Sequence, residues 1–293
     1  MRKLAPVILL VVLLGAFAYY EYQLRRTPPT LEPEPARAGV SYLLAEPIVE
    51  DGTEYLVDPD ELVSGGTNRD GIPALMNPDY ESVYAADTHL SDEGLGIFIE
   101  VAGQPYFFPF VIMSWHEIVN DTLGGKPLSV TYCPLCRSSV VYERQVDDQV
   151  LDFGTTGKLL NNNLVMYDRQ SESYWPQLLG TAVSGEMIKQ ELIQYPSKQM
   201  TFGEFKESYT YGLVLSRSTG YDRDYTQDPY WQYHENDEIM FPISIFDGRL
   251  MAKQLIYGEH DSTISAMAHE NEVESSIPAY WFCWTNAYPG TDL

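Results

Sequence analysis

Short apolar runs, bounded by glycine, proline, asparagine or aspartate, recur along the chain from residue 39 onward. Their lengths and spacing are typical of antiparallel strands. The predicted strands cover residues 96–101, 105–110, 128–132, 140–143, 150–153, 164–167 and 213–215. The sequence Val-Ala-Gly-Gln at 101–104 predicts a hairpin turn between the first two of these strands.

Helical patterns are fewer. Segment 110–120 places Val111, Trp115 and Ile118 on one face, which predicts a helix there. Thr201, followed three residues later by Glu204, forms a capping box at the start of a second helix. Segments 98–110 and 245–257 share a faint strand, glycine turn, strand pattern. We therefore predict a mainly β (α+β) fold with a few short helices, built from antiparallel sheets or a barrel-like unit, with the echo suggesting two related halves.

The first 26 residues differ from the rest. Arg2 and Lys3 precede an apolar run at 4–20, and Arg25 and Arg26 follow it. This pattern predicts an uncleaved membrane anchor, with a cleaved export signal as the alternative because Ala-Phe-Ala stands at 16–18. Residues 27–38 are rich in Pro and Glu and predict a stiff linker. Residues 39–293 then form one β-rich domain, which we expect on the extracytoplasmic side, held to the membrane through the N-terminal helix.

Composition adds a constraint on partners. The chain is 44% hydrophobic and 13% aromatic, enough to bury a sizeable core. It carries 18 Lys and Arg against 42 Asp and Glu, a net charge of −24. Binding to a nucleic-acid backbone needs clustered Lys and Arg, so we expect no nucleic-acid partner. The acidity favours solubility outside the cell, or a site that attracts cations.

Most of the candidate chemistry lies in residues 115–136. His116 ends the predicted helix, and Cys133 and Cys136 form a Cys-x-x-Cys pair at the end of the next predicted strand. Two thiolates and an imidazole suit copper, or zinc with one further ligand, so the first hypothesis is a metal site of His116, Cys133 and Cys136. The further ligand could be His89, His234, His260, His269 or Asp121, and the sequence does not choose among them.

Three alternatives stay open for this segment. Cys133 and Cys136 could form a thiol redox pair. Cys133 could act as a catalytic nucleophile, with His116 as its base and Asn120 or Asp121 as the group that orients the base. The third alternative is a non-catalytic envelope module with a plain disulfide or buried thiols, which would bind other envelope proteins.

Several other residues invite structural predictions. Cys283 stands among aromatic residues, so we expect a small buried side chain rather than a disulfide partner. Glu117 is expected on a solvated face or in a turn. Arg169 is expected to pair with Asp152 across strands. Loop 65–73 and residues 161–169 should border the site, and the Asp- and Tyr-rich stretch 219–234 is expected to be a surface loop.

Six strings carry a family resemblance: GGTNRDGIPAL (65–75), WHEIVND (115–121), GGKPLSVTYCPLCRSSVVYER (124–144), LNNNLVMYDRQSESYWPQLLGTAVSG (160–185), LVLSRSTGYDRDYTQDPY (213–230) and YWFCWTNAYPGT (280–291). With these strings the chain resembles the domain-of-unknown-function 3179 (DUF3179) family. The resemblance implies an exported or lipid-anchored protein and gives Cys133 more weight than Cys136. The chain departs from the family pattern at Arg137, where many members have Gly, and at Cys283, where Ala is usual.

Overall fold

The computed structural model of the protein describes residues 46–260, 266–273 and 275–293. The predicted anchor at 1–26 and linker at 27–38 lie outside the described residues, and so does the start of the predicted domain. Within the described part of the chain, no helix is both long and apolar enough to cross a membrane.

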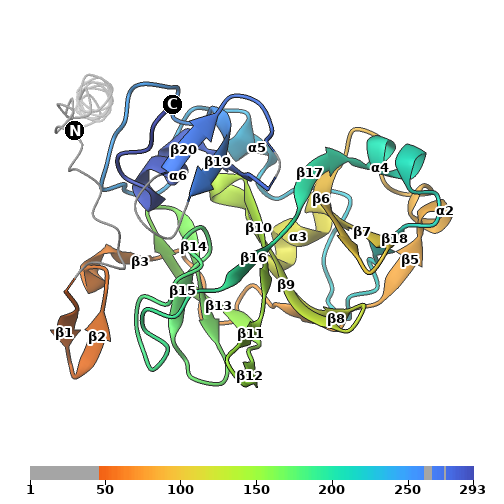
Figure 1. The fold of residues 1–293 in the computed structure, drawn as a ribbon. Helices are drawn as coiled ribbons and strands as arrows, with labels where there is room; N and C mark the ends of the chain where they lie inside the picture. The colour runs from red at the N-terminus through yellow and green to blue at the C-terminus, as the bar shows by residue number, and fades with distance from the viewer. Residues whose placement is uncertain (1–45, 261–265, 274) are drawn as a thin grey trace, which may run out of the picture. The chain divides into compact units, whose positions relative to one another are not determined.

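A five-stranded sheet runs through the middle of the described region (Figure 1). Its order is β16 (Ile193–Tyr195), β10 (Ser138–Glu143), β9 (Lys126–Cys133), β8 (Ile118–Leu123) and β4 (Leu75–Met76). All its pairings are antiparallel except β4 with β8, which is parallel. We call it the central sheet.

A second five-stranded sheet has the order β17 (Lys198–Thr201), β6 (Leu95–Val101), β7 (Gln104–Pro109), β18 (Leu213–Leu215) and β5 (Tyr80–Ser82). A four-stranded sheet contains β15 (Tyr174–Pro176), β14 (Asn163–Asp168), β13 (Phe153–Leu160) and β3 (Leu62–Ser64). A three-stranded sheet contains β20 (Ala266–His269), β19 (Leu255–His260) and β21 (Ile277–Tyr280). Two small hairpins complete the strands, β1 (Ile48–Glu50) with β2 (Thr53–Tyr55) and β11 (Gln145–Val146) with β12 (Gln149–Val150).

The helices are short. They are α2 (Val83–Ala86), α3 (Phe110–His116), α4 (Phe202–Ser208), α5 (Trp231–His234) and α6 (Trp281–Ala287), with 3₁₀ turns η2 (Pro59–Glu61) and η3 (Pro134–Cys136). The mainly β prediction with a few short helices is therefore confirmed, and the described sheets do not close into a barrel.

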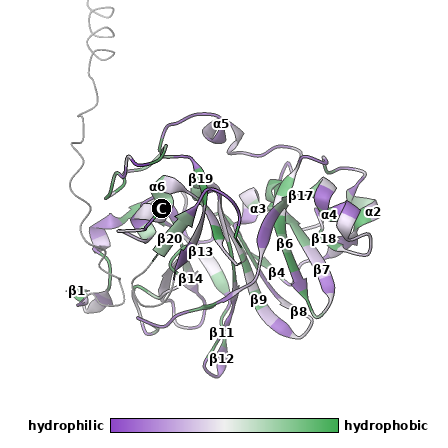
Figure 2. Ribbon diagram, turned by 45° about the horizontal axis from the view of Figure 1, so that its top comes forward, coloured by the Kyte–Doolittle hydropathy of each residue, from purple (hydrophilic) through white to green (hydrophobic). Residues whose placement is uncertain are grey.

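The central sheet is buried on both faces. Ile118, Val140 and Tyr142 pack into a core with the C-terminal strands, whereas their neighbours Val119 and Val141 pack into a second core. Successive side chains of a strand point to opposite faces, so one strand can supply both cores. This double burial explains the continuous apolar runs in the sequence. Figure 2 shows hydrophobic residues concentrated on the strands, β4 and β6 among them.

Two local predictions are confirmed. Residues 101–104 join β6 to β7, and Ala102 and Gly103 have φ values of 50° and 78°. Two successive positive φ values are typical of a type I′ hairpin turn. At α4, the Thr201 side chain accepts a hydrogen bond from the Glu204 amide, and Glu204 reaches back to the Thr201 amide. This is the predicted capping box.

Three predictions are wrong: the end of one helix, the position of one strand and an internal repeat. The helix predicted over 110–120 stops at His116, because Glu117 adopts a left-handed φ of 59° and the β-branched residues Ile118 and Val119 enter strand β8. The strand predicted over 150–153 is interrupted at residues 151–152, because Val150 ends β12 and Phe153 begins β13. The segment 245–257 is irregular until β19 begins at Leu255, so it does not repeat the β6–β7 hairpin, and the echo does not reflect two related halves.

A disulfide joins Cys136, in η3, to Cys283, in α6, across 147 residues. The Cα atoms are 5.6 Å apart, within the usual range for a disulfide. The expectation that Cys283 is an unbonded buried side chain is therefore wrong. Cys283 is buried, but η3 and α6 pack in the same core and bring the two sulfurs together.

Removing this disulfide should destabilise the fold strongly. Closing a loop this long restricts the unfolded chain, so the Cys136→Ala, Cys283→Ala double variant should lose about 4 kcal/mol of unfolding free energy. Denaturant unfolding of oxidised protein measures the loss. Reductant should lower the stability of the wild type by a similar amount and leave the double variant unchanged. Equal sensitivity of both proteins to reductant would contradict the pairing.

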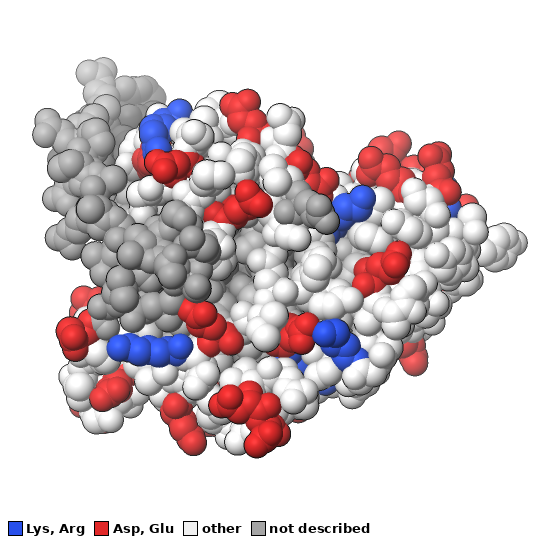
Figure 3. Space-filling view, in the orientation of Figure 1, with Lys and Arg blue, Asp and Glu red and all other residues white. Residues whose placement is uncertain are grey.

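Acidic side chains spread over the face seen in Figure 3, with fewer basic ones between them. The exposed surface therefore carries the negative charge that the composition predicts. Repulsion of this kind keeps a folded protein soluble and disfavours broad contact with anionic partners.

Candidate functional site

His116 lies at the end of α3 and is fully buried. Its Nδ1 is 2.8 Å from the Pro73 carbonyl oxygen, and its Nε2 is 2.6 Å from the Tyr225 hydroxyl. A carbonyl oxygen only accepts, so Nδ1 carries the proton and Nε2 accepts from Tyr225. The Tyr225 oxygen then accepts from Thr219, 2.6 Å away. Burial lowers the pKa of His116, so the imidazole stays neutral and positions Tyr225.

Cys133 ends strand β9, and its side chain is enclosed at 1% exposure. The sulfur accepts a hydrogen bond from the Leu164 amide at 3.4 Å and donates to the Asn162 carbonyl at 3.5 Å. Burial, reinforced by the nearby Glu117 carboxyl, raises the pKa of the Cys133 thiol to about 12. The thiol is therefore held neutral, the opposite of the condition that activates a nucleophile.

Asn120, in β8, links the central sheet to β13. Its side chain donates to the Phe153 carbonyl at 2.8 Å and accepts from the Phe153 amide at 3.1 Å. It also accepts from the Ser129 hydroxyl. Among the described residues, no hydrogen bond joins Asn120 or His116 to Cys133, so the structure does not assemble these three into a nucleophile–base pair.

Two of the three predicted metal ligands are engaged with protein partners. Cys136 is held in the disulfide and has no thiolate to offer a metal. His116 uses both ring nitrogens on protein partners. No group of three or more His, Cys, Asp or Glu side chains in the described ranges is arranged to hold a metal ion.

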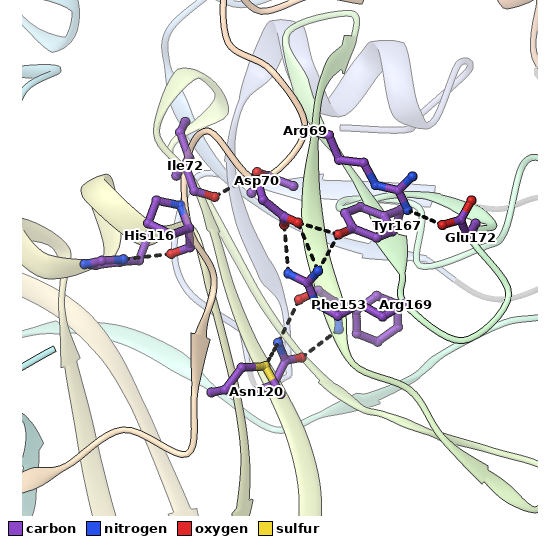
Figure 4. Close-up of polar contacts among 12 residues, drawn as sticks. Arg69, Asp70, Ile72, His116, Asn120, Phe153, Tyr167, Arg169 and Glu172 are labelled. Atoms are coloured by element: carbon purple, nitrogen blue, oxygen red, sulfur yellow. Dashed lines mark hydrogen bonds and ion pairs between the residues drawn. The ribbon is translucent and has the colours of Figure 1, made fainter. Parts of the chain in front are cut away.

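Loop 65–73 lies between His116 and strands β13 and β14 (Figure 4). Asp70 pairs with the Arg169 guanidinium through contacts of 2.8 and 2.9 Å, and accepts from the Tyr167 hydroxyl at 2.6 Å. The predicted Arg169–Asp152 pair is wrong, because Asp152 pairs with the buried Arg144 instead. These bonds hold the loop beside the predicted site, as expected, and their role is structural.

A cavity of about 450 Å³ opens beside the Cys133–Arg137 turn. Its walls come from the chain between α2 and β6, the junction of β7 and α3, the end of β9, α4 and the 225–235 segment. Its aromatic lining includes Phe107, Phe110, Tyr132, Phe202, Tyr225 and Trp231. Its polar lining includes His89, Glu93, Arg137, Asp228, His234 and Glu235. The stretch expected to be a surface loop is thus one wall of a cavity, and His116 supports that wall through Tyr225.

His234 and His89 each leave one ring nitrogen unused at this cavity. His234 Nδ1 is 3.0 Å from the Tyr280 hydroxyl, and His89 Nε2 is 2.9 Å from Glu81. His234 Nε2 and His89 Nδ1 are buried and have no hydrogen-bond partner among the described residues. Burial and the charge of Arg137 lower the pKa of His234 to about 4, so its imidazole is neutral at pH 7. The sequence suggested both histidines only among several possible further ligands of a metal site, not as part of a binding cavity.

A model of the family described as "Protein of unknown function (DUF3179)" matches residues 69–279. The chain belongs to the DUF3179 family. No curated protein and no solved structure matches it. The DUF3179 match includes every lining residue of the cavity, from His89 to Glu235, and ends just before Cys283.

Glu117 is buried, whereas the sequence predicted a solvated face or a turn. It is 6% exposed, and no described residue forms a hydrogen bond with its carboxyl group. Burial raises the pKa of Glu117 to about 8, so it is largely protonated at neutral pH. Its left-handed backbone ends α3, which turns this acid inward beside Cys133. The sequence predicted the helix end four residues later and so placed Glu117 within the helix.

Glu117 should make the fold less stable as pH rises. The unfolded carboxyl ionises near 4.5 and the folded one near 8, so the stabilisation is complete below pH 4.5 and is lost as pH rises through 8. Between pH 5 and 8, the unfolding free energy of the wild type should fall by about 3 kcal/mol relative to Glu117→Gln. Denaturant unfolding at both pH values measures this difference. The exposed Glu186→Gln variant is the control, and a parallel pH dependence of wild type and Glu117→Gln would refute the assignment.

The three cysteines should be distinguishable by alkylation and mass spectrometry. Native protein without reductant should take up no label at pH 7.5, because Cys133 is enclosed and neutral. Denatured protein should take up one label without reductant and three with it. Rapid labelling of native Cys133 would show a reactive thiolate and contradict the buried, protonated state.

Proposed function

We propose that this DUF3179 domain is an extracytoplasmic ligand-binding module, and that the cavity beside Arg137 binds a small polar organic molecule. The observation that carries the proposal is a set of polar groups there that no described residue bonds: the buried ring nitrogens His234 Nε2 and His89 Nδ1, and the partly exposed Arg137 guanidinium. A buried polar atom without a partner destabilises a protein by about 1–3 kcal/mol. A ligand that bonds the two histidine nitrogens would remove that penalty.

The size and walls of the cavity support the same proposal. A volume of about 450 Å³ falls within the usual range for small-molecule sites. Such sites combine mainly aromatic and apolar walls with a few polar groups that fix orientation. Here the aromatic walls include Tyr132 and Tyr225, and each is held in place: Tyr132 stacks on Phe110 at 4.0 Å, and Tyr225 is bonded to His116.

The compartment is part of the proposal. Disulfides persist in oxidising compartments, and the Cys136–Cys283 bond supports a location outside the cytoplasm. The basic and apolar pattern of residues 1–26 supports export and a membrane tether. A tethered binding module would hold its cavity near the membrane surface, where partner proteins of the envelope could deliver or receive the ligand.

Thermal unfolding of the full chain in mild detergent, against a library of sugars, organic acids, nucleosides and amino acids, tests the proposal. A ligand at 100 times its Kd adds about 2.7 kcal/mol of stability, which raises Tm by several degrees in a protein of this size. We expect one chemical class to do so, and the shift to shrink in Arg137→Gln but not in the exposed Arg217→Gln. No shift with any class, or an equal shift in Arg137→Gln, would refute binding in this cavity.

A further inference from the structure

We infer that the ligand is a small zwitterion, with a carboxylate that binds Arg137 and a protonated amine that binds Asp228 and His234, as in a free amino acid with a bulky apolar side chain. This inference rests on the proposed function, because it names the ligand class of the same cavity.

Arg137 is held in place by its backbone while its side chain stays unbonded. Its amide donates to the Pro134 carbonyl, its carbonyl accepts from the Gln199 side chain, and the preceding residue is in the disulfide. Its φ of 48° lies in the left-handed region, which disfavours a residue with a long side chain. No described residue forms a hydrogen bond or ion pair with its guanidinium, although the chain has 42 acidic residues. The position thus keeps a guanidinium at the cavity despite an unfavourable backbone.

A guanidinium without a partner is suited to a carboxylate. Its planar fork of N–H donors matches the two oxygens of a carboxylate and binds them in parallel. The charge of Arg137 already reaches the other cavity residues, since it contributes to lowering the pKa of His234 and opposes the rise in the pKa of Tyr132. Arg137 therefore gives the cavity a group that can bind an anion.

Asp228 and His234 together offer groups that can bind a cation. One carboxylate oxygen of Asp228 accepts from the Tyr230 amide at 2.9 Å, and the other lies 3.8 Å from His234 Nε2. That gap is too long for a hydrogen bond. An ammonium nitrogen about 2.9 Å from each atom would bridge them, donating one N–H to the carboxylate and one to His234 Nε2 in the tautomer whose Nδ1–H donates to the Tyr280 hydroxyl. This pair is suited to a primary amine.

A ligand that carries only negative or only positive charge does not match the charged groups of the cavity. Glu93 and Glu235 also line it, so a simple anion would meet three carboxylates against one guanidinium. A simple cation would leave Arg137 unpaired. Arg137 and Asp228 form no ion pair with each other, so both stay available to a ligand that carries both charges. The aromatic wall between Tyr132 and Phe110 gives such a ligand an apolar surface for its side chain.

Matched probes test each charge separately by calorimetric titration of the full chain. L-Phenylalanine carries both charges, N-acetyl-L-phenylalanine lacks the amine charge, and L-phenylalanine amide lacks the carboxylate. We expect L-phenylalanine to bind at least tenfold more tightly than either capped form. The dipeptide Gly-Phe, whose charges are farther apart, separates a free amino acid from a peptide as the source of the zwitterion, and we expect it to bind at least tenfold more weakly.

Two variants assign each charge to its partner. Arg137→Gln should weaken L-phenylalanine at least tenfold and leave the amide unchanged. Asp228→Asn should weaken L-phenylalanine at least tenfold and leave the N-acetyl form unchanged. Arg217→Gln and Asp148→Asn, both exposed and outside the cavity, are the matched controls. The comparison of the capped probes uses wild-type protein alone, so it decides the question even if a variant fails to fold.

The outcomes separate this inference from the proposed function. If a capped form binds as tightly as L-phenylalanine, the cavity binds a ligand and the zwitterion is wrong. If no amino acid or dipeptide binds but another class in the thermal library does, the zwitterion is wrong and the binding module stands. If no compound binds in either assay, both are wrong.

Discussion

Burial of the central sheet on both faces is the constraint on which the rest of this structure depends. The polar side chains buried on its strands have no water to bond, so they must find partners inside the protein. Asn120 bonds to β13, Thr131 bonds to the Val140 carbonyl, and Ser138 bonds to Gln177. Asn120, which the sequence suggests as a catalytic residue, is therefore engaged in joining the central sheet to β13.

Residues with positive φ values gather at one corner of the central sheet. Glu117, Arg137 and the pair Asn161–Asn162 all adopt positive φ, and the turns they form meet around Cys133. The Cys133 sulfur fills this junction with weak hydrogen bonds to β14. A small, neutral thiol suits that place, because a charged group would lose its hydration without gaining a counterion. The cavity lies beside this corner, on the side where Arg137 emerges.

Local patterns in the sequence were enough to predict local structure. The turn at 101–104 and the capping box at Thr201 each depend on residues within a few positions of one another. The alternation of the two cores was not visible, because strands buried on both faces show no period of two. The internal echo misled because it rested on composition without the β pairing that makes a hairpin.

The sequence predicted which region of the chain holds the candidate site, but not which residues form it. Residues 115–137 and loop 65–73 do come together, but Cys136 finds Cys283 across 147 residues, and no local pattern encodes that distance. Glu117 became a buried acid only because the helix ended earlier than its apolar pattern indicated. His234 and Asp228 come from a stretch whose polar composition is typical of a surface loop, and only the packing of that stretch over α3 and β9 makes it a wall.

The distance in sequence between the disulfide partners also sets an order of events. Cys133 and Cys136 leave the ribosome well before Cys283, and the chain has only these three cysteines. Any intramolecular disulfide made before residue 283 emerges must therefore join Cys133 to Cys136. To reach the native pairing, the Cys283 thiolate must then attack the Cys136 sulfur and release Cys133 as a thiol, an exchange that needs no further oxidant. In such an exchange the buried Cys133 thiol is the leaving group, and the native pairing can form only after α6 has been synthesised.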